Sequence, residues 1–237
     1  MAPLKKEFMP ALISIPEGDF LMGSENGMDN EKPAHRVWVN GFMMGKFPVT
    51  NKEYGIFVEE TGAQQPPFWR EAMFSHPDKP VVGVSWHDAV CYCGWLTDRI
   101  GKPFRLPTEA EWERAARGGK EGEKYPWGDE LPSEKIYPGY DVETGGPERV
   151  GFNEPNGFGL YDISASVHEW CGDFYDANYY QISPERNPAG PPTGLRKVSR
   201  GGSWRHRIKF SRSAARSSLN PSFQYADYGF RVAMRLE

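Results

Sequence analysis

The sequence has few cysteines, and none follows Cys171. Chemistry that depends on a pair of thiols near the C-terminus is therefore excluded. The number of cysteines is odd, and Cys91 and Cys93 lie two residues apart on an expected helix, where they point in different directions. We expect no disulfide framework, and we interpret all three cysteines as small buried hydrophobic residues.

Long hydrophobic runs and a surplus of positive charge are also missing. No run approaches the ~20 apolar residues that cross a bilayer, and Met1–Pro10 has no apolar core of a secretion signal. We expect a cytoplasmic protein with no membrane partner; a signal peptide already trimmed would leave no trace. The net charge of −4 gives no basic field for a phosphate backbone, so we expect no nucleic-acid partner either.

Glycine, proline and aromatic residues are abundant instead. The chain has 26 Gly and 21 Pro in 237 residues, and 14% of it is aromatic. This composition is too aromatic for disorder and too interrupted for long helices. We predict a single domain spanning residues 1–237, of the α+β class, in which turns dominate.

Local signals predict several helices and strands. Thr50 or Asn51 caps a helix that Gly62 ends, Ser85 caps a helix over Trp86–Ile100, and Thr108 with Glu111 forms a capping box. The remaining predictions are a hairpin over Phe8–Gly23, strands at His35–Val39, Val81–Val84, Lys197–Arg200 and Gly229–Arg235, and a long irregular loop over Gly118–Pro155.

Nine short motifs occur in an order and spacing that chance does not explain. They are Met22–Ser24, Glu31–His35, Pro48–Asn51, Val84–Trp86, Arg105–Glu113, Tyr125–Gly128, Asn156–Asp162, Arg200–Trp204 and Gly229–Arg231. Together they resemble the formylglycine-generating enzyme (sulfatase-modifying factor) family, from about Phe8 to Arg235. The resemblance implies an irregular, loop-rich C-type-lectin-like fold with little regular secondary structure and with structural calcium. It fixes the fold better than the reaction.

The resemblance also implies a set of calcium ligands. They are the Asp162 side chain, the backbone carbonyls of Ala165 and Val167, and the Glu169 carboxylate, although Ala165 stands where the family commonly has glycine. The alternative is that Asp162 and Glu169 cap the backbone and pair with arginines. A second calcium site of the family needs an asparagine at about Ile136, and we expect that site to be altered or absent.

The catalytic cysteines of the family are missing. Formylglycine formation uses two cysteines, three and eight residues after the serine that corresponds to Ser203, to bind copper. No cysteine follows Ser203 here, so the copper–thiolate mechanism is excluded. The ergothioneine branch of the family takes iron-binding histidines from a separate helical domain, which this chain does not include.

Two histidines support a different chemistry. His168 stands where the family has a tryptophan of its substrate groove, and His206 falls at about the first missing cysteine. With a carboxylate from Asp173, Asp227 or Glu169 they could bind iron or copper, so His168, His206 and Ser203 are our catalytic candidates for a metal-dependent oxidase. The alternative is that the histidines only form hydrogen bonds.

Cationic and aromatic residues favour a ligand-binding groove in the same region. Its candidates are Trp204, Arg205, His206, Arg207 and Tyr225, which suit a peptide or a small anionic ligand. The alternative is that part of the arginines, such as Arg216 and Arg231, form internal salt bridges. A third interpretation is that the chain binds a protein partner, as an accessory or maturation protein of another enzyme would.

Overall fold

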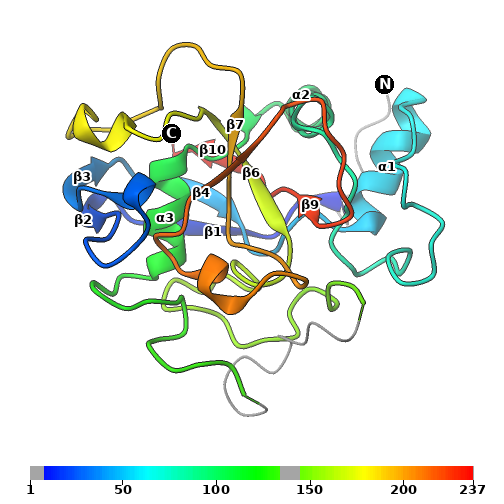
Figure 1. The fold of residues 1–237 in the computed structure, drawn as a ribbon. Coiled ribbons are helices and arrows are strands. Elements are labelled where there is room, and N and C mark those ends of the chain that lie inside the picture. Colours follow the sequence, from blue (N-terminus) through cyan, green and yellow to red (C-terminus); the bar gives the residue numbers. More distant parts are fainter. Residues whose placement is uncertain (1–7, 134–144, 237) are drawn as a thin grey trace.

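The computed structural model describes residues 8–133 and 145–236 (Figure 1). In this part of the chain, three α-helices and three sheets make up most of the regular structure. The helices are α1 (Asn51–Thr61), α2 (Trp86–Ile100) and α3 (Glu109–Arg117). Short 3-10 turns lie at Asp29–Glu31, Tyr179–Gln181 and Ile208–Ser211. The rest is loop, so the prediction of a turn-dominated α+β fold is confirmed.

Strands that are distant in sequence pair within these sheets. The first sheet has the order β1-β4-β10-β5, the second pairs β2 with β3, and the third has the order β8-β7-β6-β9. The strands are β1 (Leu12–Ile15), β2 (Gly18–Met22), β3 (His35–Val39), β4 (Phe42–Gly45), β5 (Phe104–Arg105), β6 (His168–Phe174), β7 (Lys197–Arg200), β8 (Ser217–Leu219), β9 (Tyr228–Gly229) and β10 (Ala233–Arg235).

The three α-helices begin at predicted caps, and of the two candidates for α1 the cap is Thr50 and not Asn51. Thr50, Ser85 and Thr108 each accept a hydrogen bond from the backbone of the third helical residue, whose side chain bonds back to the cap. Each helix ends at a glycine in the left-handed conformation, which a residue without Cβ adopts at little cost. Among the described helices, none is long and apolar enough to cross a membrane.

The predicted hairpin over Phe8–Gly23 is wrong. β1 pairs with β4, with Leu12 opposite Gly45, whereas β2 pairs with β3 in a different sheet. Both strands are adjacent in sequence, but each buries its apolar face against a different partner. Strand pairing depends on these distant partners, which a local pattern cannot identify.

Two other strand predictions and one cysteine need correction. Val81–Val84 is buried but forms no regular ladder, and the predicted strand over Gly229–Arg235 is divided between β9 and β10. Cys93 and Cys171 are buried as expected, but Cys91 is exposed because it lies on the outer side of α2. The loop predicted over Gly118–Pro155 contains no helix or strand in its described residues.

Helix α3 lies between the β2–β3 sheet and the sheet that contains β6 and β7 (Figure 1), and every one of its residues is buried. It contacts β2 and β3 as well as β6 and β7. Its buried carboxylates, Glu109 and Glu113, pair with the guanidinium groups of Arg117, Arg200 and Arg216. Burial of charge requires such pairing, so this network connects helix α3 to β7 and to the segment before β8.

Candidate functional site

A parallel strand pair brings two candidate residues together. β6 begins at His168 and pairs with β9, placing His168 opposite Tyr228 and Glu169 opposite Gly229. Asp227 precedes β9, and its carbonyl accepts the backbone N–H of His168 at 2.8 Å. Asp227 therefore lies beside His168, the first residue of β6.

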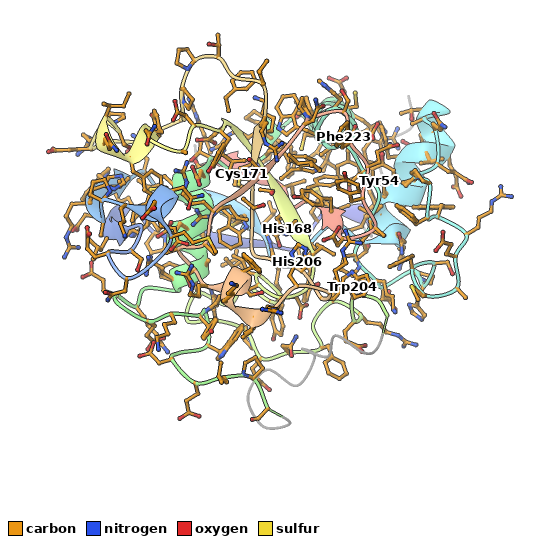
Figure 2. All side chains as sticks on the ribbon, viewed as in Figure 1. Tyr54, His168, Cys171, Trp204, His206 and Phe223 are labelled. Carbon is orange, nitrogen blue, oxygen red and sulfur yellow. The ribbon has the colours of Figure 1, made fainter. Side chains whose placement is uncertain are left out.

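A turn after β7 adds the second histidine. Gly201 and Gly202 both have positive φ angles, and the N–H of Trp204 then donates to the Ser166 carbonyl at 2.9 Å. The N–H of His206 donates to the Ser203 carbonyl, which closes a tight turn. This backbone path carries the His206 ring back to His168, and Figure 2 shows the two side chains next to one another.

The cluster His168–His206–Asp227 has a close geometry. Nε2 of His168 lies 3.0 Å from Nδ1 of His206, and Nε2 of His206 lies 3.6 Å from Oδ2 of Asp227. One nitrogen or oxygen atom from each of the three residues lies within 4.8 Å of the others. The His168 ring also stacks on Tyr228, with 4.7 Å between the ring centroids. The histidines are thus placed by packing as well as by hydrogen bonds.

Asp227 is the fully buried member of the cluster, and two neighbours fix its carboxylate. Ser203 Oγ donates to Oδ2 at 2.9 Å, and Nη2 of Arg205 donates to Oδ1 at 2.6 Å. Arg205 therefore balances the buried charge from the solvent side, where its own side chain is 42% exposed. The orientation leaves Oδ2 as the oxygen nearer to the His206 ring.

Both histidines are held in the neutral form. Burial lowers the pKa of His168 to about 3, against an opposing effect of Asp227. Burial also lowers the pKa of His206, which is half-exposed. Nδ1 of His168 is buried and has no hydrogen-bond partner among the described residues. Neutral imidazoles can share one proton between Nε2 and Nδ1, or they can bind a metal ion.

The 3.0 Å separation of the two imidazole nitrogens suits metal coordination. Two nitrogens bound at about 2.1 Å and at a right angle around one ion lie about 3 Å apart. Of the three carboxylates considered from the sequence, Asp227 joins the histidines in this cluster. Asp173 instead accepts the backbone N–H of Glu109, and Glu169 pairs with Arg231.

The ligand-binding candidates divide into two kinds. Trp204 is half-buried against Phe74, and Arg205 is paired with Asp227. Arg207 and Tyr225 are exposed, and Arg207 forms no ion pair within the described residues. As the alternative reading predicted, Arg216 and Arg231 form internal salt bridges, to Glu109 and Glu169.

Two of the expected calcium ligands, Asp162 and Ala165, have an unusual backbone conformation. Their φ angles are 52° and 60°, so Ala165 adopts the left-handed conformation where the family commonly has glycine. Asp162 is buried and has no ion-pair partner in the described part of the chain. Its carboxylate accepts N–H bonds from Gly151 and Asn153, while burial raises its pKa. This carboxylate fits a cation ligand.

Glu169 does not fit the same role. Its Oε1 accepts from Nε and Nη2 of Arg231, and its Oε2 accepts from Nε of Arg231 and from the Trp112 indole N–H. These four contacts fill the roughly four acceptor positions of a carboxylate. Glu169 is therefore committed to Arg231 and Trp112 and is not free to bind calcium in this arrangement. The second calcium site, at about Ile136, lies outside the described residues.

Chelation tests the calcium prediction directly. Because Arg231 already neutralises Glu169, we expect dialysis against EGTA to leave Tm within about 2 °C of the value in calcium buffer, a change equivalent to well under 1 kcal/mol. The measurement is thermal unfolding in EGTA and in calcium, with magnesium as the matched control ion. A calcium-specific rise in Tm above about 5 °C would show that the ion displaces Arg231 or uses Asp162 with other ligands.

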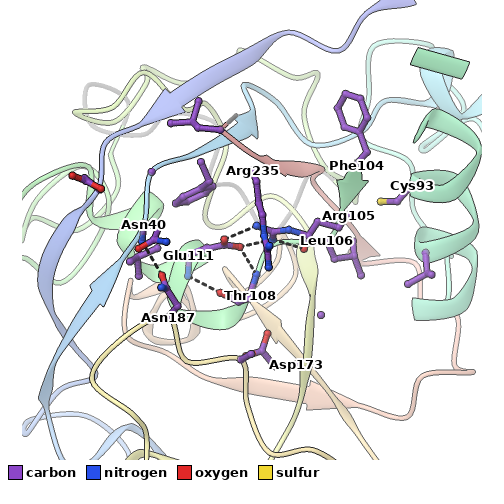
Figure 3. Close-up of a pocket in the computed structure, with 18 of the residues that line it drawn as sticks. Asn40, Cys93, Phe104, Arg105, Leu106, Thr108, Glu111, Asp173, Asn187 and Arg235 are labelled. Carbon is purple, nitrogen blue, oxygen red and sulfur yellow. Dashed lines mark hydrogen bonds and ion pairs between the residues drawn. The ribbon is translucent and has the colours of Figure 1, made fainter. Parts of the chain in front are cut away.

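One feature, a pocket separate from the histidine cluster, was not predicted from the sequence. A pocket of about 1000 Å³ lies beside α2 and the start of α3 and includes Asp173 in its lining (Figure 3). The sequence placed Asp173 among the carboxylates that could complete a metal centre. The structure instead places Asp173 in this pocket and His168 in the cluster with His206 and Asp227.

Comparisons with known proteins agree on one family of domains. The model of the sulfatase-modifying factor enzyme 1-like domain matches residues 1–236. The formylglycine-generating enzyme of Thermomonospora curvata is 32% identical over 96% of this chain and 94% of that enzyme. The structure of PvdO from Pseudomonas aeruginosa superposes with a TM-score of 0.83, at 29% identity, and the match covers 96% of this chain and 95% of that one.

A second group of relatives is much longer. The serine/threonine-protein kinase pkn1 of Chlamydia pneumoniae is 34% identical over 99% of this chain. The match covers 39% of the kinase, so this chain spans less than half the length of that relative.

Proposed function

The chain belongs to the sulfatase-modifying factor family, and we propose that it is a metal-dependent member in which His168, His206 and Asp227 hold a transition metal, iron or copper. The observation that carries this proposal is the convergence of the three side chains, with 3.0 Å between the two imidazole nitrogens. From the resemblance, His206 stands at about the position of the first catalytic cysteine. The proposed centre would thus occupy the region of the family's chemistry with different ligands.

Each residue has a distinct role in this proposal. The two imidazoles are neutral at physiological pH and need not lose a proton to bind a metal. Asp227 supplies negative charge, while Ser203 and Arg205 fix its orientation. When bound, a metal held by two histidines and one carboxylate offers open coordination positions and acts as a Lewis acid.

The adjoining surface gives the proposed substrate a place to bind. Arg205 and Arg207 flank His206 in sequence and are exposed, and Trp204 and Tyr225 supply aromatic area. A peptide or a small anionic molecule that contacts Arg207 would lie close to the centre.

A second candidate function is binding without chemistry, including the binding of a protein partner by an accessory or maturation protein. It is favoured by Phe223 and Tyr225, whose side chains are 48% and 42% exposed and whose ring centroids lie 6.0 Å apart. Exposed aromatic side chains beside cationic residues are typical of interaction surfaces.

Metal titration separates the two candidates. The purified protein is stripped of metal and titrated anaerobically with Fe²⁺, and with Cu²⁺ and Zn²⁺, while bound metal is measured by elemental analysis. We expect about one ion per chain, and at least tenfold weaker binding in His168→Ala, His206→Ala and Asp227→Asn. His87→Ala, which removes an exposed histidine outside the cluster, is the matched control and should bind as the unmodified protein does.

The opposite result is equally clear. If the unmodified protein binds none of the three metals, or binds them equally well after loss of His168 and His206, the metal centre is wrong. Binding without chemistry then becomes the better description of this domain.

A further inference from the structure

The pocket beside α2 contains charged groups that the proposed metal centre does not use. Its lining comes from the β3–β4 connection, from α2, from the start of α3, and from β6 and β10 (Figure 3). The walls are largely apolar, with contributions from Val39, Phe42, Trp86, Val90, Phe104 and Leu106. A volume of about 1000 Å³ is at the upper end of small-molecule sites.

Two of the charged residues in the lining neutralise one another. Nη1 and Nη2 of Arg105 each bond one carboxylate oxygen of Glu111 at 2.6 Å. Glu111 also accepts the N–H of Thr108 and thereby caps α3. This pair is structural, and it leaves no net charge for a ligand.

Three other charged residues line the pocket, and Glu17 is exposed to solvent, which leaves Asp173 and Arg235 as the opposite charges to be considered. Asp173 is 4% exposed, and its Oδ2 accepts the backbone N–H of Glu109 at 2.9 Å. Arg235 extends into the pocket from β10, on the exposed side of that strand. Among the described residues, neither has an ion-pair partner within 4 Å, so they do not satisfy each other either. Figure 3 shows both side chains pointing toward the same part of the pocket.

We propose that this pocket binds a small zwitterion, an α-amino acid with an apolar side chain or a short peptide of such residues. Its ammonium group would pair with Asp173, its carboxylate with Arg235, and its side chain would lie against Phe42, Trp86 and Phe104. A buried carboxylate and a separate guanidinium in one cavity are both satisfied by a ligand that carries both opposite charges. Once Asp173 has lost its proton, a ligand with a single charge would leave one of the two unpaired.

Proton binding provides a second signature of this site. Burial, together with Glu109, raises the pKa of Asp173 to about 8, so a ligand ammonium must compete with the proton on this carboxyl. Other titratable groups also interact electrostatically with Asp173: Glu111, Cys171, Tyr179 and the cations Arg105 and Lys197. The affinity for an amino acid should rise between pH 6 and pH 8 as Asp173 loses its proton.

Calorimetric titration with L-phenylalanine and its two truncated analogues tests the proposal. We expect saturable binding of phenylalanine, and at least tenfold weaker binding in Asp173→Asn and in Arg235→Ala. 2-Phenylethylamine, which lacks the carboxylate, should be insensitive to Arg235→Ala; 3-phenylpropanoate, which lacks the amine, should be insensitive to Asp173→Asn. The exposed substitution Arg36→Ala, outside the pocket, is the control.

Two results would overturn the assignment. One is the absence of saturable binding of L-phenylalanine and of the dipeptide Phe-Phe up to about 10 mM. The other is binding that both pocket variants retain unchanged. The comparison of the ligands is made on the unmodified protein, so it does not depend on whether a variant folds. Asp173→Asn keeps an oxygen that can accept the Glu109 N–H, so we expect this variant to fold.

Discussion

Replacing Arg200 by methionine is expected to lower the free energy of unfolding by about 3–5 kcal/mol. Arg200 is fully buried, and its Nη1 and Nη2 donate to Glu109 at 2.9 Å and to Glu113 at 2.5 Å. Nη2 also donates to the Ser213 carbonyl at 2.8 Å. Although burial lowers its pKa, Tyr180, Glu113 and Glu109 raise the pKa of Arg200 above its ordinary value.

The size of the effect follows from the charges that the substitution leaves behind. Glu113 is fully buried, and among the described residues it keeps only Arg117 as its cationic partner once Arg200 is lost. Glu109 keeps Arg216. Because removal of one partner leaves buried charge uncompensated, the loss exceeds what the ion pair itself contributes.

The measurement is urea denaturation at pH 7, with Arg36→Met as the matched control. Arg36 pairs with Asp19 and Glu121 on the surface, where water screens the charges. The urea midpoint of the Arg36→Met variant should therefore remain almost unchanged. A loss below about 1 kcal/mol in Arg200→Met would mean that the remaining arginines or water compensate the carboxylates, and that the network is not a stabilising feature of the fold.

Replacing Asp173 by asparagine is expected to flatten the pH dependence of stability. In the folded protein, burial first and the nearby Glu109 second raise the pKa of Asp173 to about 8. Between pH 4 and pH 8 the folded protein therefore holds a proton that the unfolded chain has released. Unfolding releases this proton, so the contribution of Asp173 to stability is lost as the pH rises through this window.

Asparagine cannot ionise, so the variant avoids that loss. We expect the two proteins to have similar stability near pH 4.5, and the variant to be more stable by on the order of 3–5 kcal/mol at pH 8. Urea denaturation at half-unit steps from pH 4.5 to pH 8 measures the difference. Asp176→Asn, an exposed change after the same strand, is the control; parallel curves for Asp173→Asn and the unmodified protein would contradict a protonated Asp173.

The fit between sequence and structure differs from element to element. The starts of the helices are predicted to within one residue, because each capping box joins groups three residues apart; Thr50, and not the alternative Asn51, caps α1. The strand at His35–Val39 and the strand at Lys197–Arg200 are also correct. The hairpin over Phe8–Gly23 is wrong because its two strands pair with β4 and β3, and nothing within the segment specifies those partners.

The candidate site shows the same division. The sequence identified His168 and His206 from their positions in the resemblance, and it offered Asp173, Asp227 and Glu169 as carboxylates. The structure places these three in different surroundings: Asp227 beside the histidines, Glu169 against Arg231 and Trp112, and Asp173 in a separate pocket. The choice depends on the packing around β6, where Glu169 meets Arg231 and Trp112 and Asp173 lines the separate pocket.

The sequence by itself determined the family, the helix boundaries and the absence of a C-terminal cysteine pair, because motifs, caps and residue types are local properties. Only the tertiary structure decided which strands pair, that His168 and His206 meet across 38 residues of sequence, and that Arg200 lies between two buried glutamates. These contacts form when distant segments bury their apolar faces together, and every buried charge must then find its partner among the groups that packing brings within reach.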